Sequence, residues 1–190
     1  MNKKIIKSTP FGSVGVIWTG FNDNPRILRV LLSKPGLSVE EQVAEIYPNS
    51  QASSCAEVDA VADAIKGLLE GDDIEISLDV ADLDMCSVFQ QSVLRAEYRI
   101  PRGSISTYQL IAEYLGKRNG ARAVGNALAN NPFPLIVPCH RAIRSDRQLG
   151  GYQGGLEMKR ALLEMEGITF DDAGRVVCEQ LHYERIMSNF

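Results

Sequence analysis

Short apolar runs separated by polar residues dominate the beginning of the chain. The runs at 14–18 and 27–32 are rich in β-branched and aliphatic residues, which favours strands, and the polar sequence at 22–25 predicts a turn between them. A third run, 74–78, alternates apolar and polar residues as a half-buried strand does. These runs predict a small sheet.

Apolar residues with helical spacing lie between the last two of these runs. Positions 58, 61, 65, 68 and 69 fall on one face, which predicts an amphipathic helix that ends at Gly71. Ser54 and Glu57 have the spacing of a capping box that would begin this helix. A shorter helix is expected over 39–47. The pattern therefore predicts an α/β unit.

The pattern changes where acidic residues interrupt it at 79–85. We place a domain boundary there, which gives an α/β N-terminal domain (1–85) and a second domain (86–190). The second domain is expected to be mainly helical, with a helix-turn-helix and a short active-site strand. Its last helix is predicted over 156–166, and a short strand over 175–177 in the C-terminal tail.

Two adjacent helical patterns in this domain predict the helix-turn-helix. Residues 107–115 and 121–130 have helical spacing, and a polar segment bounded by glycines, 116–120, separates them. The second helix is slim: one face is apolar, and the other carries a single arginine, Arg122, among small residues and asparagines. Such a helix can approach nucleic acid closely, although a short alanine-rich packing helix has the same composition.

The charge distribution changes what the overall balance implies. The chain of 190 residues has a net charge of −4, which argues against a nucleic-acid partner. However, residues 1–85 carry a net −7, residues 86–141 a net +5 and residues 142–190 a net −2. The basic middle segment is compatible with a phosphate-facing surface, and equally with a random fluctuation of surface charge.

The chain has the composition of an ordinary globular protein, with 45% hydrophobic and 23% charged residues. Its first residues lack the long apolar segment and cleavage site of a signal peptide, and no apolar run has membrane-spanning length. We therefore expect a cytoplasmic protein without a membrane partner, and a monomer.

The four cysteines are far apart and form no Cys-x-x-Cys pair, so neither a disulfide framework nor a zinc ribbon is indicated. The N-terminal domain contains only Cys55 and no histidine. We therefore expect no metal site and no cofactor, and reduced thiols.

Candidate chemistry is concentrated in Pro138-Cys139-His140-Arg141, which follows the apolar run 134–137. Cysteine attacks as the thiolate, and an unperturbed thiol is only slightly ionised at neutral pH. A neighbouring imidazole can take the proton, directly or through a water. The pair Cys139-His140 therefore suggests a nucleophile and its base, and the alternative is a structural cysteine at a strand end.

Several motifs together resemble one known family, the O6-alkylguanine-DNA alkyltransferases, also called methylated-DNA–protein-cysteine methyltransferases. The segment 131–141 (Asn-Pro-Phe-Pro-Leu-Ile-Val-Pro-Cys-His-Arg) is similar to the family's active-site signature. The resemblance covers about residues 86–168, and residues 1–85 are similar only in layout. The flanking motifs occur in the family's order: Ile-Pro-Arg-Gly at 100–103, Thr-Tyr at 107–108, Ala-Arg-Ala-Val-Gly at 121–125, Gly-Gly-Leu at 154–156 and Glu-Gly at 166–167.

The resemblance implies a set of catalytic residues. Cys139 would accept the alkyl group, His140 would act as base through a water, and Glu166 would orient and stabilise His140. Tyr108 would hydrogen-bond the base and neutralise charge on the departing guanine. Asn131 would brace the turn between the recognition helix and the active-site strand.

The resemblance also implies a DNA surface and a substrate pocket. Arg122 would fill the place of a flipped base, and the partner would be double-stranded DNA with O6-alkylguanine, approached from the minor groove. The remaining DNA-binding residues would be Ala121, Ala123, Asn126, Thr107 and Arg102. The pocket would be formed by Pro138, Ala142, Tyr152, Gln153 and Gly154, of which the last three belong to the glycine-rich loop 150–155.

The function implied is direct reversal of DNA alkylation, with each molecule consumed by one transfer to Cys139. Two alternatives stay open: a non-catalytic protein that binds alkylated DNA, and a helix-turn-helix regulator switched by cysteine methylation. The first is disfavoured because Cys139 is present, and the second because 190 residues leave little room for additional domains. The sequence leaves open the preferred alkyl size and whether O4-methylthymine is accepted.

Overall fold

The computed structural model describes residues 1–20 and 25–184, and most of the turn predicted at 22–25 lies outside them. The chain forms two compact units. The first contains Met1–Met85 together with Pro132–Ile136, and the second contains Cys86–Asn131 and the chain from Val137 onwards. The domain division at residues 85 and 86 stays a prediction. The first part is α/β and the second is mainly helical, which confirms the expected fold class.

The first unit is built on a sheet with the order β3-β2-β1-β4. Strand β2 lies in its middle and pairs antiparallel with both β1 and β3. Val14, Val16 and Ile17 in β2 are each at most 1% exposed and belong to the core. The strands are β1 (Asn2–Thr9), β2 (Gly12–Thr19), β3 (Arg26–Leu32) and β4 (Gln51–Ala52), of which β1 and β4 were not predicted.

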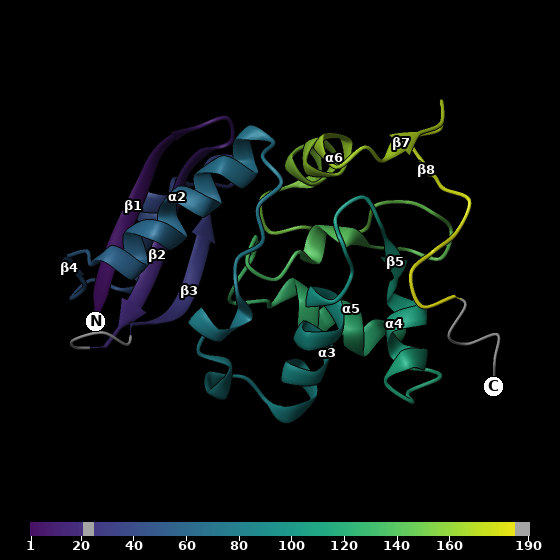
Figure 1. Cartoon of the computed structure of the whole chain (residues 1–190), viewed down its shortest axis with the longest axis horizontal. Helices are drawn as coiled ribbons and strands as arrows, with labels where there is room; N and C mark the ends of the chain where they lie inside the picture. The colour runs from purple at the N-terminus through teal and green to yellow at the C-terminus, as the bar shows by residue number, and fades with distance from the viewer. Residues whose placement is uncertain (21–24, 185–190) are drawn as a thin grey trace. The chain divides into compact units, whose positions relative to one another are not determined.

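Two helices pack on this sheet: α1 (Val39–Ile46) contacts β2 and β3, and α2 (Ala56–Glu70) contacts β1. Figure 1 shows α2 lying along the sheet. The capping box predicted at Ser54 is wrong, because α2 begins after Cys55 without a side-chain cap. The hydroxyl of Ser54 bonds Asp59 instead. A capping box does begin α1, where Ser38 and Glu41 exchange side-chain and backbone hydrogen bonds.

The strand predicted at 74–78 is also wrong. The segment is irregular and leads into a 3-10 turn, η1 (Leu78–Val80), in which the Ser77 hydroxyl accepts a hydrogen bond from the amide of Asp79. A second 3-10 turn, η2 (Leu83–Met85), follows. Among the residues that the structure describes, the contact of this region with the sheet includes an isolated bridge between Ile27 in β3 and Ala81, after the alternating run.

The second unit is mainly helical and contains the predicted helix-turn-helix. Its second helix packs Val124 and Leu128 inward and leaves the opposite face exposed, as its sequence pattern indicated. The helices are α3 (Val88–Tyr98), α4 (Tyr108–Tyr114), α5 (Ala121–Ala129) and α6 (Leu156–Met165). The short strands are β5 (Ser106–Thr107), which pairs with β6 (Ala142–Ile143), and β7 (Thr169–Phe170), which pairs with β8 (Val176–Val177).

The apolar run before the Cys-His pair is a turn rather than a strand. Leu135 has a φ of 75°, a conformation that no regular strand contains. Cys139–Arg141 form a 3-10 turn, η3, and the only extended residues next to the cysteine belong to β6, which follows it. The short strand next to Cys139, β6, therefore follows the cysteine in the chain.

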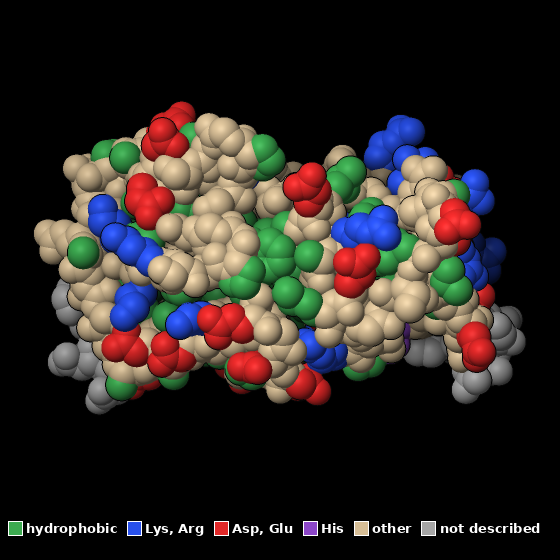
Figure 2. Space-filling model, turned by 90° about the horizontal axis from the view of Figure 1, so that it is seen from above, with side chains coloured by type: hydrophobic (Ala, Val, Ile, Leu, Met, Phe, Trp, Pro, Cys, Tyr) green, Lys and Arg blue, Asp and Glu red, His purple; other side chains and the backbone are tan. Residues whose placement is uncertain are grey.

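Over residues 1–20 and 25–184, no helix is long and apolar enough to cross a membrane. Within the same ranges, His, Cys, Asp and Glu side chains form no group of three or more that could hold a metal ion. Acidic and basic side chains are mixed over the face seen in Figure 2. The phosphate-facing surface proposed for residues 86–141 stays a prediction.

Candidate active site

A cavity of about 170 Å3 in the second unit has Cys139 in its lining. One wall comes from the second helix of the helix-turn-helix, α5, and a second wall comes from the glycine-rich loop. Tyr108, the first residue of α4, completes it. The lining residues are Tyr108, Gly125, Leu128, Ala129, Cys139, Gly151 and Tyr152. The two helices and the reactive turn thus meet at one pocket.

Cys139 is a buried thiol whose surroundings favour the neutral form. Cys139 is 5% exposed. Burial raises the pKa of its thiol to about 11, and a hydrogen bond with Asn131 offsets part of this increase. At neutral pH the thiolate fraction is therefore far smaller than that of an exposed cysteine. Any nucleophilic role of this sulfur requires a base that removes the proton.

Asn131 is placed to brace the reactive turn. Its side-chain amide donates to the carbonyl of Val137, at a distance of 3.2 Å, and the residue is 1% exposed. Its own carbonyl accepts a hydrogen bond of 2.7 Å from the side chain of Gln153 in the glycine-rich loop. Asn131 thereby joins the end of α5, the turn before Cys139 and the loop wall of the pocket.

His140 is neutral in this environment. Burial lowers the pKa of its imidazole, and this outweighs the hydrogen bond and charge of Glu166, which act in the opposite direction. Nε2 lies 3.0 Å from Oε1 of Glu166, whereas the buried Nδ1 has no hydrogen-bond partner among the described residues. We assign the tautomer from these partners: Nε2–H donates to Glu166, and the lone pair of Nδ1 is free to accept a proton.

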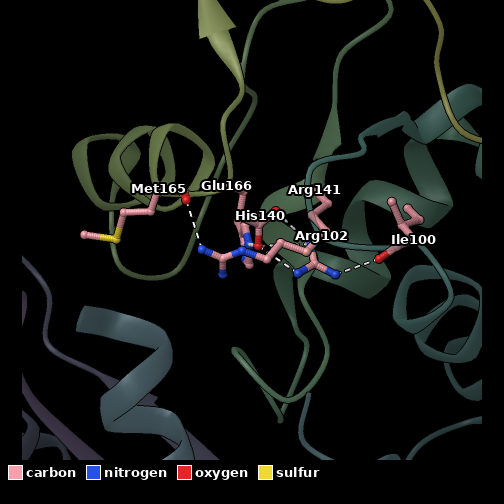
Figure 3. A network of polar contacts seen from close by, with 6 residues as sticks. All are labelled: Ile100, Arg102, His140, Arg141, Met165 and Glu166. Atoms are coloured by element: carbon pink, nitrogen blue, oxygen red, sulfur yellow. Dashed lines mark hydrogen bonds and ion pairs between the residues drawn. The ribbon is translucent and has the colours of Figure 1, made fainter. Parts of the chain in front are cut away.

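Glu166 is an ionised carboxylate that is hydrogen-bonded to His140 and to Arg141 (Figure 3). Burial opposes its ionisation, but hydrogen bonds from His140 and from Arg141 outweigh burial and lower its pKa to about 2. The Arg141 guanidinium reaches the carboxylate through Nε at 2.9 Å and Nη2 at 2.7 Å, and its Nη1 donates to the carbonyl of Ile100. This two-point clamp fixes the carboxylate beside the imidazole.

A buried lysine near the cavity was not foreseen from the sequence. Lys159 is 0% exposed, and its Nζ donates to the carbonyls of Ala142 and Leu149, both at 2.6 Å. Burial lowers its pKa to about 8. A longer contact of 3.4 Å to the carbonyl of Gly151 reaches the glycine-rich loop, so Lys159 connects β6 with this loop.

A buried acid, Glu97 in α3, was not foreseen either. It is 0% exposed, and neither carboxylate oxygen has a hydrogen-bond partner of good geometry among the described residues. Burial raises its pKa to about 8, although the charge of Lys159 acts against this. Glu97 follows the core positions Val93 and Leu94 in α3, and Lys159 precedes Leu162 and Leu163 in α6. Both therefore have helical spacing to buried apolar residues, and this spacing was the available signal.

The glycine-rich loop approaches Tyr108 closely. Gly150 has a φ of +70°, and a Cβ atom at this position would lie 2.8 Å from the hydroxyl of Tyr108. Only glycine allows both this backbone conformation and this contact. Burial raises the pKa of Tyr108 to about 12, so its hydroxyl stays protonated and is a hydrogen-bond donor.

The predicted DNA-binding residues differ in their exposure. Arg122, Ala123 and Asn126 are exposed on α5, and Ala121 is half-buried. Thr107 is 3% exposed, and its hydroxyl caps α4 by accepting from the amide of Leu110. Its side chain therefore serves the helix.

Arg102, also predicted to bind DNA, is half-buried and donates to the carbonyl of Met165 at the end of α6 (Figure 3).

Of the residues predicted for the substrate pocket, Tyr152 lines the cavity. Its buried hydroxyl has no partner among the described residues, and its ring meets the His140 ring edge-on at 6.2 Å. Pro138 and Ala142 are buried beside the reactive turn, and Gln153 and Gly154 are half-buried in the loop. The α5 residues Gly125, Leu128 and Ala129 and the loop residue Gly151 line the cavity and were missed.

A helix-turn-helix whose second helix forms the wall of a pocket, with a buried cysteine and a His-Glu pair, defines a DNA-binding protein with a thiol reaction centre. Residues 88–168 match the family model described as 6-O-methylguanine DNA methyltransferase, DNA binding domain. A methylated-DNA–protein-cysteine methyltransferase from Methanothermobacter thermautotrophicus is 36% identical over 162 residues, which cover 85% of this chain and 84% of that protein. The chain belongs to the methylated-DNA–protein-cysteine methyltransferase family, as the resemblance predicted.

This chain is also similar to solved structures of O6-methylguanine methyltransferases. The OGT of Mycobacterium tuberculosis, solved in complex with DNA, has a TM-score of 0.70 and 31% sequence identity, covering 87% of this chain and 92% of that chain. The O6-methylguanine-DNA methyltransferase from Pyrococcus kodakaraensis has a TM-score of 0.67 and 25% identity, covering 87% of this chain and 98% of that chain. Both likenesses extend well beyond the helix-turn-helix.

Proposed function

We propose that this protein repairs DNA by direct reversal: it moves a methyl or other alkyl group from O6 of guanine in double-stranded DNA to its own Cys139. The observation that carries this proposal is the cavity of about 170 Å3, lined jointly by Cys139 and by α5 of the helix-turn-helix. A helix that contacts DNA and also walls the thiol pocket brings the lesion to the sulfur. The DNA complex of the Mycobacterium tuberculosis OGT supports DNA as the partner.

Access to the pocket requires the damaged base to leave the duplex. Extrusion costs a few kcal/mol, and less for a base that pairs poorly. Arg122 on the exposed face of α5 enters the stack from the minor groove and fills the vacated place. The small exposed neighbour Ala123 lets the helix approach the backbone closely.

Activation of the sulfur follows from the charges around it. Because the pKa of Cys139 is about 11, a base is needed, and neutral His140 supplies one through Nδ1 and a bridging water. The imidazolium that forms is stabilised by the ionised Glu166, whose carboxylate is already hydrogen-bonded to Nε2. Asn131 keeps the reactive turn in place.

In the transfer step, a sulfur–carbon bond forms while the bond between the alkyl carbon and O6 breaks. The electron pair of the broken bond passes to the guanine, and the thiol proton passes to His140. The protonated hydroxyl of Tyr108 donates to the base and neutralises the charge that develops there. Gln153 and the backbone near Cys139 and Ala142 hold the polar edges of the base. The product is a thioether, so each molecule reacts once.

The test is incubation with a duplex that contains one O6-methylguanine, followed by intact-mass measurement and peptide mapping. We expect a gain of one methyl group at Cys139, together with loss of the lesion. Cys139→Ser should show no gain, and Cys55→Ser, which changes a cysteine outside the pocket, should react like the wild type. Tight binding of the duplex by the wild type without any gain in mass would overturn the proposal in favour of a lesion-binding protein.

A further inference from the structure

The C-terminal segment, residues 178–184, lies beyond the family match that ends at residue 168. It follows β8 and is the yellow stretch that runs past β5 towards α4 in Figure 1. The guanidinium of Arg147 holds its beginning by donating to the carbonyl of Cys178 at 2.8 Å. The beginning of the segment is therefore attached to the second unit.

Two hydrogen bonds to the backbone of His182 attach this segment beside β5. The amide of His182 donates to the carbonyl of Ile105 at 2.8 Å, and the hydroxyl of Ser106 donates to the carbonyl of His182 at the same distance. The next residue, Thr107, caps α4, and Tyr108 is the first residue of that helix. The segment thus fixes the backbone directly before the pocket tyrosine.

Tyr183 anchors the segment to the other end of α4. Its ring stacks on Tyr114 with centroids 4.1 Å apart and an interplanar angle of 19°, and its hydroxyl donates to the carbonyl of Ala96 in α3 at 2.7 Å. Arg99 in turn donates to the hydroxyl of Tyr114. Tyr183 is 4% exposed and has a φ of 72°, an unfavourable conformation for a non-glycine residue, which is retained where the surroundings determine it.

Tyr114 is the last residue of α4, and the turn that follows leads into α5. We propose that Tyr183 is a positioning residue for the helix-turn-helix: by clamping Tyr114 against α3, it holds α4 and α5 in the arrangement that engages DNA. This inference rests on the proposed function, because it assigns α5 to the DNA surface.

The size of the effect follows from what Tyr183 contributes. A stacked aromatic pair and a buried hydrogen bond each shift the equilibrium between the held and the released arrangement of α4 by a few-fold to about tenfold. Without them α4 is held less firmly, and only a fraction of molecules has the helix pair in its binding arrangement. The apparent affinity for DNA falls in proportion to that fraction.

The test compares single-turnover methyl transfer at increasing concentrations of O6-methylguanine duplex. For Tyr183→Ala we expect the half-saturating duplex concentration to rise about tenfold, with a limiting rate within about twofold of the wild type. Tyr183→Phe keeps the stacking and loses only the hydrogen bond, so we expect a rise of about threefold. Val177→Ala, at a residue 53% exposed just before the segment, is the matched control and should behave as the wild type.

A purely structural role would lower the fraction of protein that reacts, at every duplex concentration, and leave the half-saturating concentration unchanged. That result, or unchanged half-saturation in Tyr183→Phe if the alanine variant does not fold, would overturn the inference. If the wild type transfers no methyl group, the proposed function fails separately. Fluorescence anisotropy with undamaged duplex then decides: weaker binding by the Tyr183 variants supports the inference, and equal binding overturns it.

Discussion

The ion pair between Glu166 and Arg141 should make a large contribution to stability that depends on pH. The pKa of Glu166 is about 2, compared with an ordinary value of 4.5. A difference of this size corresponds to about 3 kcal/mol of stabilisation at pH 7, at about 1.4 kcal/mol per pKa unit. The side chain is only 4% exposed, so solvent screening reduces this value little.

The direction of the pH dependence follows from the lowered pKa. As the pH falls, the unfolded chain protonates Glu166 near pH 4.5, whereas in the folded protein Glu166 stays ionised until the pH approaches 2. Its contribution is therefore complete above about pH 4.5 and is lost progressively as the pH falls towards 2. At pH 3 roughly half of it should be left.

The perturbation is Glu166→Gln, which removes the charge and keeps the shape. Urea unfolding at pH 7 should show a loss of about 3 kcal/mol, which shrinks to roughly half at pH 3. Glu164→Gln is a matched control close by, because Glu164 is half-exposed and pairs with Arg160 on the surface, an interaction worth less than about 1 kcal/mol. A loss that is the same at pH 7 and pH 3 would refute the assigned ionisation.

Four further predictions concern the pocket and its surroundings. Arg122→Ala should slow methyl transfer from a duplex far more than reaction with free O6-benzylguanine, and equal losses would contradict its role in the stack. Labelling of Cys139 by iodoacetamide, followed by peptide mapping, should keep accelerating up to a pH of about 11, and a plateau near pH 8 would contradict the effect of burial. Glu97→Gln should remove a pH dependence of stability: because the pKa of Glu97 is raised to about 8, the wild type is expected to lose stability as the pH rises from 4.5 to about 8, and an unchanged slope in the variant would count against this. Gly150→Ala should slow transfer by about tenfold because its Cβ would displace the Tyr108 hydroxyl, whereas at Gly151 a Cβ meets nothing within 4 Å, so Gly151→Ala should react normally; similar rates for both variants would argue against a role for this contact.

The parts of the fold that the sequence predicted depend on local patterns. The helix-turn-helix was recognisable because apolar spacing, a glycine-bounded turn and small residues agree with one another. The strand at 74–78 was predicted wrongly, because strand formation needs a partner edge that a local pattern does not reveal. The capping box was assigned to Ser54 although Ser38 has the same spacing to a glutamate, and the structure selects Ser38.

Only part of the candidate site was predicted, because here too the prediction depended on patterns that are visible in the sequence. Cys139 and His140 are adjacent in the sequence, and the family resemblance added Glu166, whose hydrogen bond with His140 the structure contains. Lys159 and Glu97 were missed because tertiary packing determines their burial. A charged residue among core positions of a helix is the signal that would have indicated them, since charged side chains are rarely fully buried unless they are paired.

The path of the chain before Cys139 limits how this protein can be divided. Pro132–Ile136 belong to the first compact unit, where the carbonyl of Pro132 accepts a hydrogen bond of 2.8 Å from Val30 in β3. Phe133 and Ile136 in this stretch are at most 2% exposed. A gene fragment that begins at residue 86 would encode this stretch without β3, the strand that hydrogen-bonds it. The two halves are therefore not interchangeable modules, and recombination between relatives would have to exchange Pro132–Ile136 together with the N-terminal sheet.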